Sequence, residues 1–426
     1  MKAIKQVVSK RNVLLIIFII FGLVLRFNFS SLAYRELVFD MKSYVGLAKR
    51  VIDEFFVADC CSKNTGYPLF LALAFRLWGG INLEIVRMIQ VGMDVAAGLL
   101  IYVTTKRLLS AKASIIFLIL YMINPYTSAM TGLILPDSIT IFYLALLVWV
   151  IGLKSFAVKP SLWFLSGIIL GTMLLTRVQY LYLFIFLVAA FVWFIIDKER
   201  RFVYLVAHLA GFMIPSIYTL VSNYREHQIV SLMPPYTFQA GHLYLMFYQI
   251  VPYPEVVYNP EHPEESRVWM EFALTPLESK NAFSEKYYAL FWQKLQTEWP
   301  LFFYNWARKA WWLWDKEHVF IYHDPYYPSD RWPLRILNSA LFLSAGMGIY
   351  KYISANGNRA LQNPVILLTV ILFTQITFLY SLVSSEARHS LIFYPLLMLW
   401  AAYGISLINS KSQIPSRKYS GQANSK

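Results

Sequence analysis

The chain has 426 residues, of which 58% are hydrophobic and 15% are charged, and its formal net charge is +14 at pH 7. Soluble domains are only about 45–50% apolar, so this composition excludes an ordinary soluble domain and predicts several membrane-spanning helices. In such a protein an excess of Lys and Arg is expected in the cytoplasmic loops, so the charge need not indicate nucleic acid.

Ten apolar segments approach the length of a spanning helix and predict an all-α, polytopic membrane protein: 13–29, 84–103, 113–130, 133–153, 161–176, 178–196, 202–221, 333–350, 364–383 and 390–408. A cleaved signal peptide over 1–33 is the alternative for the first segment. With a cytoplasmic N-terminus, the inner segments hold 18 of the 38 Lys and Arg residues but only two of the 24 Asp and Glu residues. This bias predicts that both termini are cytoplasmic.

The spans divide the chain into three parts. Residues 1–221 form an N-terminal transmembrane module that includes a first outer loop at 30–83, residues 222–332 form a large extracytoplasmic loop, and residues 333–426 form the C-terminal helices and a cytoplasmic tail. Other outer connections are tight turns.

The first outer loop begins with an amphipathic pattern. Its apolar residues recur at helical spacing and comprise Met41, Tyr44, Val45, Ala48, Ile52, Phe55 and Phe56. This spacing predicts a helix lying in the membrane interface, with its lysines near lipid phosphates. Residues 66–78 predict a second interfacial helix or a re-entrant segment. Residues 298–320, rich in Trp and basic side chains, favour the headgroup layer, although aromatic faces also stack on sugars.

Cys60 and Cys61 are the only cysteines. Adjacent Cα atoms lie about 3.8 Å apart, below the usual separation in a disulfide, so two free or heterogeneously oxidised thiols are favoured, and a strained bridge between neighbours is the alternative.

Polar side chains gather at the outer ends of four predicted spans: Asp40, Asp137, Arg177, and the group Glu386, Arg388 and His389. Simple alternatives exist for each of them. Asp40 could cap the helix that follows, Asp137 could favour a helix start, and the arginines could anchor span ends at the interface. Asp94 lies inside the second span, where a charge indicates a cavity or an internal partner.

Several segments in this order resemble the GT-C membrane glycosyltransferases, most of all the bacterial branch related to protein O-mannosyltransferases and the lipid A aminoarabinose transferase. They are FDMKSYVGLAKRVID, GYPLFLAL, VRMIQVGMDVAAGLLIY, NPYTSAMTGLILPDSITIFYLAL, TRVQYLYLF and EARHSLIFYPLLMLWAAYGI. The resemblance covers nearly the whole chain except 222–332.

The resemblance implies an enzyme that uses a polyprenyl-phosphate sugar donor. Asp40 matches the family's first-loop acid, the proposed base or acceptor-orienting group, while the donor phosphate is expected near Arg388, Arg177, Lys63 and His389. Secondary candidates are Asp137, Tyr44, Glu386 and Asp94. Many relatives carry paired first-loop acids, whereas Met41 follows Asp40 here, which leaves open a divalent metal or another base. The sequence assigns no metal site; ligation by His318, His323 and Asp324 is the minor alternative.

These residue types suit inverting glycosyl transfer, in which a carboxylate takes the proton of the acceptor hydroxyl and cations stabilise the departing phosphate. The sequence therefore predicts a hexosyl- or pentosyltransferase of a bacterial inner membrane, acting outside on a lipid, protein or polysaccharide. The alternatives are a transporter or flippase of lipid-linked sugars, and a glycan polymerase or ligase that uses lipid diphosphates. The sugar, the acceptor and the prenyl length are not specified by the sequence.

Overall fold

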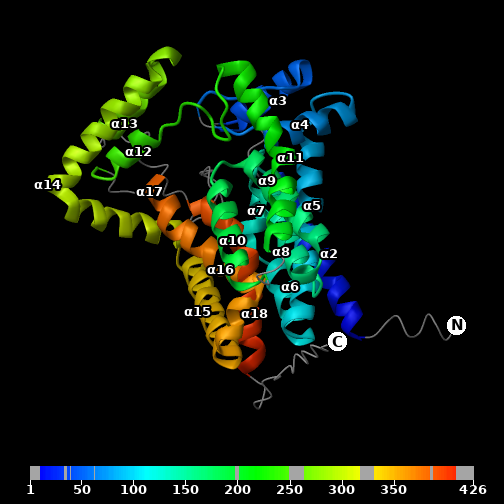
Figure 1. Ribbon diagram of the computed structural model, residues 1–426. Coiled ribbons are helices and arrows are strands. Elements are labelled where there is room, and N and C mark those ends of the chain that lie inside the picture. Colours follow the sequence, from blue (N-terminus) through cyan, green and yellow to red (C-terminus); the bar gives the residue numbers. More distant parts are fainter. Residues whose placement is uncertain are drawn as a thin grey trace.

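The computed structural model describes residues 10–32, 36–38, 40–61, 63–196, 201–248, 263–316, 331–383 and 387–408. Within these ranges the regular structure is helical and contains no strand, as the sequence predicted (Figure 1). The N-terminal half contains α2 (Lys10–Leu32), α3 (Asp40–Glu54), α4 (Gly66–Trp78), α5 (Leu83–Leu108), α6 (Ala111–Met122), α7 (Pro125–Met130), α8 (Asp137–Ile151), α9 (Pro160–Thr176), α10 (Tyr180–Phe194) and α11 (Arg201–His227). The remainder contains α12 (Gln239–Leu245), α13 (Pro263–Leu274), α14 (Lys280–Trp314), α15 (Arg331–Asn356), α16 (Pro364–Thr374), a π-helical segment η5 (Gln375–Tyr380), α17 (Ser381–Val383), a 3₁₀ segment η6 (Ala387–Phe393) and α18 (Tyr394–Ile408).

Capping side chains explain why several of these helices begin where they do. The Asn82 side chain accepts hydrogen bonds from the backbone at the start of α5, and Ser110 does the same for α6. Asn124 caps α7, whose first residue is Pro125. The Asn-Pro pair therefore divides the predicted span 113–130 into two helices, α6 and α7.

Among the residues that the structure describes, four helical segments are long and apolar enough to cross a membrane: Val13–Leu32, Leu83–Leu108, Arg201–His227 and Arg388–Ile408. A bent pair, Trp332–Gln362 and Pro364–Tyr380, meets at 96° and adds a fifth if it is one broken span. Shorter apolar helices occupy the other predicted spans, so the protein is a multi-pass membrane protein while the number ten stays a prediction.

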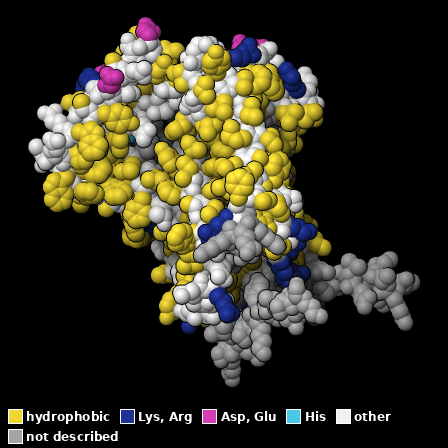
Figure 2. All heavy atoms as spheres, viewed as in Figure 1, with side chains coloured by type: hydrophobic (Ala, Val, Ile, Leu, Met, Phe, Trp, Pro, Cys, Tyr) yellow, Lys and Arg dark blue, Asp and Glu magenta, His cyan; other side chains and the backbone are white. Residues whose placement is uncertain are grey.

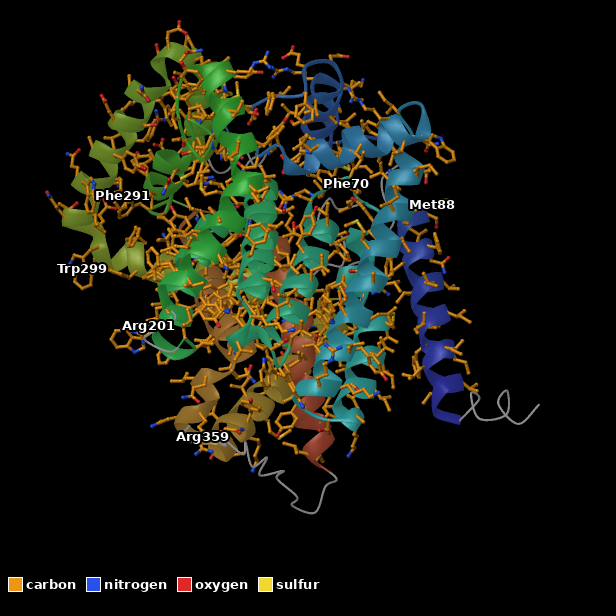
Figure 3. All side chains as sticks on the ribbon, turned by 45° about the vertical axis from the view of Figure 1, so that its right-hand side comes forward. Phe70, Met88, Arg201, Phe291, Trp299 and Arg359 are labelled. Atoms are coloured by element: carbon orange, nitrogen blue, oxygen red, sulfur yellow. A yellow bond between two sulfur atoms is a disulfide. The ribbon has the colours of Figure 1, made fainter. Side chains whose placement is uncertain are left out.

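Several pairs of helices approach closely through glycines, among them α9 with α11 and α15 with α18. A Cβ atom on Gly211 of α11 would clash with the backbone carbonyl of Phe164 in α9, and one on Gly404 of α18 would clash with Ser344 in α15. Small residues at such crossings let helix backbones pack closely in a membrane. Large apolar side chains lie on the outside of the bundle, among them Met88 on α5 and Trp299 on α14, which are 55% and 57% exposed (Figure 3).

The first loop and most of the 222–332 segment lie at the same end of the bundle, where α3, α4, α12, α13 and α14 are seen (Figure 1). α12, α13 and α14 share a second hydrophobic core that includes Phe238, Val268 and Tyr287. We call these three helices the outer unit. On the face drawn in Figure 2, most of the Lys and Arg side chains lie at the end opposite the outer unit, and others lie at the same end as the outer unit together with the Asp and Glu side chains.

Two surface expectations need correction. α3 forms as predicted, but Met41, Tyr44 and Ala48 on its apolar face are buried in the protein core with α4 rather than turned to lipid. In α14, Trp311 is 68% exposed and available to a headgroup layer, whereas Lys309 is only 1% exposed. The burial of Lys309 excludes it from contact with lipid phosphates.

Candidate active site

Three segments that are distant in the chain meet at Asp40. This residue begins α3, and its two carboxylate oxygens accept hydrogen bonds from different cations. Lys63 Nζ, from the loop before α4, donates to Oδ1 over 2.7 Å, and Arg388 Nη2, from η6, donates to Oδ2 over 2.9 Å. The Asp40, Lys63 and Arg388 side chains are 27%, 16% and 7% exposed. The structure therefore brings together three of the candidates from the sequence, Asp40, Arg388 and Lys63.

The two cations are held by local hydrogen bonds. Asp59 Oδ2 accepts the backbone N–H of Lys63 over 2.7 Å, which fixes the start of that side chain. Near Arg388, the buried Lys316 donates to Ser390 Oγ over 2.5 Å and to the carbonyl of Leu313 at the end of α14. The outer unit and η6 are thus joined beside the Asp40 cluster.

The electrostatic setting keeps Asp40 ionised. Burial alone would raise the pKa of its carboxyl, but the charges and hydrogen bonds of Arg388 and Lys63 together hold that pKa well below its usual range. As long as both cations remain in place, Asp40 is a weak base.

A second ion pair joins Asp137 at the start of α8 to Arg177 at the end of α9. Asp137 is the first residue of α8, where the helix dipole favours a negative charge, and Arg177 follows the last residue of α9. Arg177 Nη2 donates to Asp137 Oδ1 over 2.8 Å, and both side chains are largely buried. Asp137 Oδ2 is buried without a hydrogen-bond partner among the described residues. One acceptor atom in this pair is therefore left for a ligand or a water.

Tyr44 and His389 line the same region. The Tyr44 ring packs edge-on against Tyr67, and the Lys63 ammonium lies 5.7 Å from its centroid. Burial raises the pKa of the Tyr44 hydroxyl, so it is a neutral donor at physiological pH. His389 lies beside Tyr380, with 5.6 Å between the ring centroids, and makes no ion pair with Asp40 within the described part of the chain.

Asp94 is not part of this cluster. Asp94 is fully buried and accepts hydrogen bonds from Arg26 Nε and from the Tyr121 hydroxyl. It therefore has the internal partner that its place in a span required, and it ties α2, α5 and α6 together. Glu386, with His318, His323 and Asp324, lies outside the described residues.

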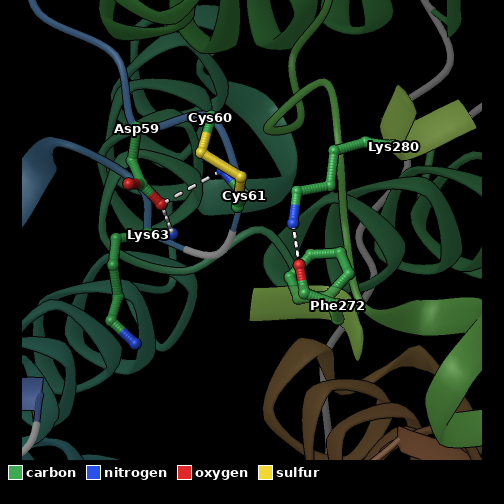
Figure 4. The surroundings of a disulfide bond; sticks show 6 residues. All are labelled: Asp59, Cys60, Cys61, Lys63, Phe272 and Lys280. Atoms are coloured by element: carbon green, nitrogen blue, oxygen red, sulfur yellow. Dashed lines mark hydrogen bonds between the residues drawn. A yellow bond between two sulfur atoms is a disulfide. The ribbon is translucent and has the colours of Figure 1, made fainter. Parts of the chain in front are cut away.

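The expected state of the cysteines was wrong. Cys60 and Cys61 form a disulfide, with 3.7 Å between their Cα atoms (Figure 4). Their adjacency makes the bridge uncommon but does not forbid it, because the two side chains can close a small ring around the intervening peptide. Asp59 and Lys316 were also missed; a carboxylate four residues before Lys63 was a signal for Asp59, whereas Lys316 had none.

Among the described residues, no three His, Cys, Asp or Glu side chains lie close enough together to bind a metal ion. Asp40 and Asp137 are each engaged by cations instead. A requirement for a divalent metal stays an open expectation.

The helical bundle and its buried charged cluster define a multi-pass membrane protein whose polar site lies where the first loop meets the segment before the last helix. Comparison with known proteins is consistent with the GT-C resemblance, because one family model matches part of the chain and the fold is similar to that of archaeal oligosaccharyltransferases. The family model described as dolichyl-phosphate-mannose-protein mannosyltransferase matches residues 63–221, which include Lys63, Asp137 and Arg177. No curated protein matches the chain.

Three solved structures from Archaeoglobus fulgidus are similar in fold. The oligosaccharyltransferase tethered with an acceptor peptide has a TM-score of 0.51 and 13% identity, over 93% of this chain and 49% of that one. Its apo form has a TM-score of 0.50 and 13% identity, over 93% and 50%. The oligosaccharyltransferase AglB in complex with an inhibitory peptide and a dolichol-phosphate has a TM-score of 0.50 and 12% identity, over 94% and 50%. This chain spans about half the length of these proteins.

Proposed function

We propose that the protein is an inverting glycosyltransferase that moves a sugar from a polyprenyl-phosphate donor to an acceptor hydroxyl on the extracytoplasmic face. The observation that carries this proposal is the contact of one carboxylate, Asp40, with two cations from distant segments, Lys63 and Arg388. The similarity to dolichyl-phosphate-mannose-protein mannosyltransferases supports the donor class.

The phosphate of the donor would bind where Arg388 and Lys63 now contact Asp40, because Arg and Lys form strong charge-assisted hydrogen bonds with phosphate oxygens. Arg177 lies close enough to Arg388 for the two charges to interact, which adds a third cation to this region. His389 is a further candidate to bind the phosphate of the sugar donor, since its Nδ1 is buried without a hydrogen-bond partner among the described residues.

Donor binding would also activate the base. When Arg388 and Lys63 turn to the phosphate, Asp40 loses the partners that lower its pKa, and the carboxylate becomes able to accept a proton. The acceptor oxygen then attacks C1 of the sugar while its proton passes to Asp40. The bond between C1 and the phosphate oxygen breaks, and its electron pair leaves with the prenyl phosphate. Direct attack from the opposite side inverts the anomeric carbon.

The placement in the membrane follows from charge. The bias of Lys and Arg toward the inner segments supports cytoplasmic termini, and the cluster around Asp40 then faces outward. We assign the protein to a bacterial inner membrane and the choice of acceptor to the 222–332 segment. The transferred sugar is a hexose or a pentose.

A radiolabelled-sugar transfer assay with purified protein tests the proposal. We expect transfer from prenyl-phosphate sugars, loss of transfer in Asp40→Asn, and a raised donor KM in Arg388→Ala. Asp53→Asn is the matched control, because Asp53 lies on the exposed side of the same helix. If Asp40→Asn is fully active while Arg388→Ala is inactive with a prenyl-diphosphate donor, the protein is a lipid-diphosphate ligase or polymerase instead. Movement of lipid-linked sugar across vesicles without transfer indicates a flippase.

A further inference from the structure

The loop between α3 and α4 contains a disulfide that the proposed chemistry does not use. Cys60 and Cys61 are joined, and both side chains are half-buried, so a small reductant can reach them. Because the two residues are adjacent, the bond closes a small ring that includes their shared peptide and restricts the backbone there. The restricted segment ends at Cys61, two positions before Lys63.

One carboxylate oxygen connects this ring to Lys63. Asp59 Oδ2 accepts the N–H of Cys61 over 3.3 Å and the N–H of Lys63 over 2.7 Å, as Figure 4 shows. The orientation of the Cys61 peptide and the position of the Lys63 backbone therefore depend on the same atom. From that backbone the Lys63 side chain extends to Asp40, where Nζ donates over 2.7 Å.

The disulfide ring also contacts the outer unit and the segment that precedes α12. The N–H of Tyr236 donates to the Cys60 carbonyl over 2.9 Å, and the Cys61 side chain packs against the hydrophobic core of the outer unit. The disulfide is thus fixed by contacts with Tyr236 and the outer unit, and by the hydrogen bond between Asp59 and the Cys61 N–H.

We propose that the Cys60–Cys61 disulfide and Asp59 are positioning residues that keep the Lys63 ammonium beside Asp40, from where it can turn to the donor phosphate, so that the oxidised protein binds this phosphate and the reduced protein binds it poorly. The proposal rests on the proposed function for its catalytic consequence. Reduction by a trialkylphosphine consumes one phosphine and one water per disulfide and yields two thiols and the phosphine oxide. The backbone of Cys61 is then free to turn, and its N–H and that of Lys63 need no longer share the Asp59 oxygen.

The first test does not depend on activity. Full-length protein in detergent is acylated with a succinimidyl ester, and labelling of individual lysines is measured by peptide mass spectrometry with and without prior reduction by the phosphine. Lys63 should label several-fold faster after reduction, because its amine leaves the ion pair with Asp40, whereas the exposed Lys49 on α3 should not change. Unchanged labelling of Lys63 refutes the proposal.

Variants separate positioning from a general structural effect. Cys60→Ser/Cys61→Ser should label Lys63 at the reduced rate with or without phosphine. Asp59→Ala should have the same effect, whereas Asp59→Asn keeps an acceptor oxygen and should restore slow labelling. Equal labelling in Asp59→Ala and the wild type removes Asp59 from the proposal, which is then wrong in its present form.

Kinetics provide the second test. Reduction should raise the donor KM about tenfold, the effect expected for the loss of one charge-assisted hydrogen bond, with kcat changed less. In Lys63→Met reduction should leave the donor KM unchanged, since there is no ammonium to position. An equal rise in both proteins shows a merely structural role and refutes the proposal. If the wild type transfers no sugar at all, the proposed function fails, and the labelling result still decides whether the disulfide positions Lys63.

Discussion

Replacing Asp40 with Asn removes one charge from the cluster and changes its shape little. The carboxylate accepts charge-assisted hydrogen bonds from Lys63 at 2.7 Å and from Arg388 at 2.9 Å. An amide keeps one acceptor oxygen but places an NH₂ group against one of the cations. Hydrogen bonds to charged groups contribute about 1.5–3 kcal/mol each, and the 27% exposure of Asp40 favours the lower end of that range. We expect unfolding to become easier by about 1–3 kcal/mol.

The catalytic loss should be larger than this loss of stability. A positioned general base contributes about 10²–10⁴-fold to the rate, so kcat of Asp40→Asn should fall by that factor at saturating donor. The assay is radiolabelled-sugar transfer, with thermal unfolding and size-exclusion profiles to verify that the variant is folded. Asp53→Asn should match the wild type in both. A folded Asp40→Asn variant that retains more than about a tenth of wild-type kcat refutes the assignment of Asp40 as the base.

The pH dependence follows from the direction of the Asp40 pKa shift. Because the folded-state pKa is lowered, the ion pairs stabilise the protein fully above the unfolded-state value of about 4, and this contribution is lost as the pH falls through the folded-state value. The difference in unfolding temperature between wild type and Asp40→Asn should therefore be constant from about pH 8 to pH 5 and shrink below about pH 4. A difference that already shrinks near neutral pH contradicts the lowered pKa.

Other substitutions test features outside the Asp40 cluster. Asp94→Asn should lower the free energy of unfolding by about 3–5 kcal/mol, because it leaves Arg26 charged and buried. Replacing both Arg26 and Asp94 with Leu should recover much of this loss. If the single and the double variant are equally destabilised, the pairing of Arg26 with Asp94 does not account for the loss. Gly211→Val should destabilise the protein through a clash with the Phe164 carbonyl. Its unfolding temperature should be lower than that of the control Gly46→Val, because Gly46 is exposed. An unfolding temperature of Gly211→Val equal to that of the wild type contradicts the close crossing. Lys309→Met should raise the unfolding temperature, because burial lowers the pKa of Lys309 to about 7 and disfavours its charge; a lower unfolding temperature contradicts that cost.

The parts of the fold that depend on local pattern could be predicted from the sequence. The apolar spacing after Asp40 predicted α3, and the apolar runs predicted the helices of the bundle. What covers an apolar face is a tertiary property, so the pattern of α3 could not distinguish lipid from α4. The division at Asn124 and Pro125 was missed, because the chain is apolar on both sides of this cap and helix start.

In the candidate site, too, the sequence indicated the residues but not the contacts between them. Asp40, Arg388 and Lys63 were found because polar residues at span ends are uncommon and because their order resembled a family. Their mutual contacts join residues separated by 23 and 348 positions, which no local pattern specifies. The partner of Asp94 was expected in kind, whereas its identity as Arg26 depends on how α2 packs beside α5 and α6.

That packing has a consequence for biogenesis. α2 exposes apolar side chains along most of its length, yet Arg26 is fully buried against Asp94, which lies 68 residues later in the chain. A lone Arg at a helix centre disfavours insertion by about 2.5–3.5 kcal/mol, and Arg26, which lies six residues before the end of α2, carries a smaller penalty. Because Asp94 is made 68 residues after Arg26, we expect the two charges to pair only once α5 has been synthesised. We therefore expect the integration of α2 to be completed together with that of α5.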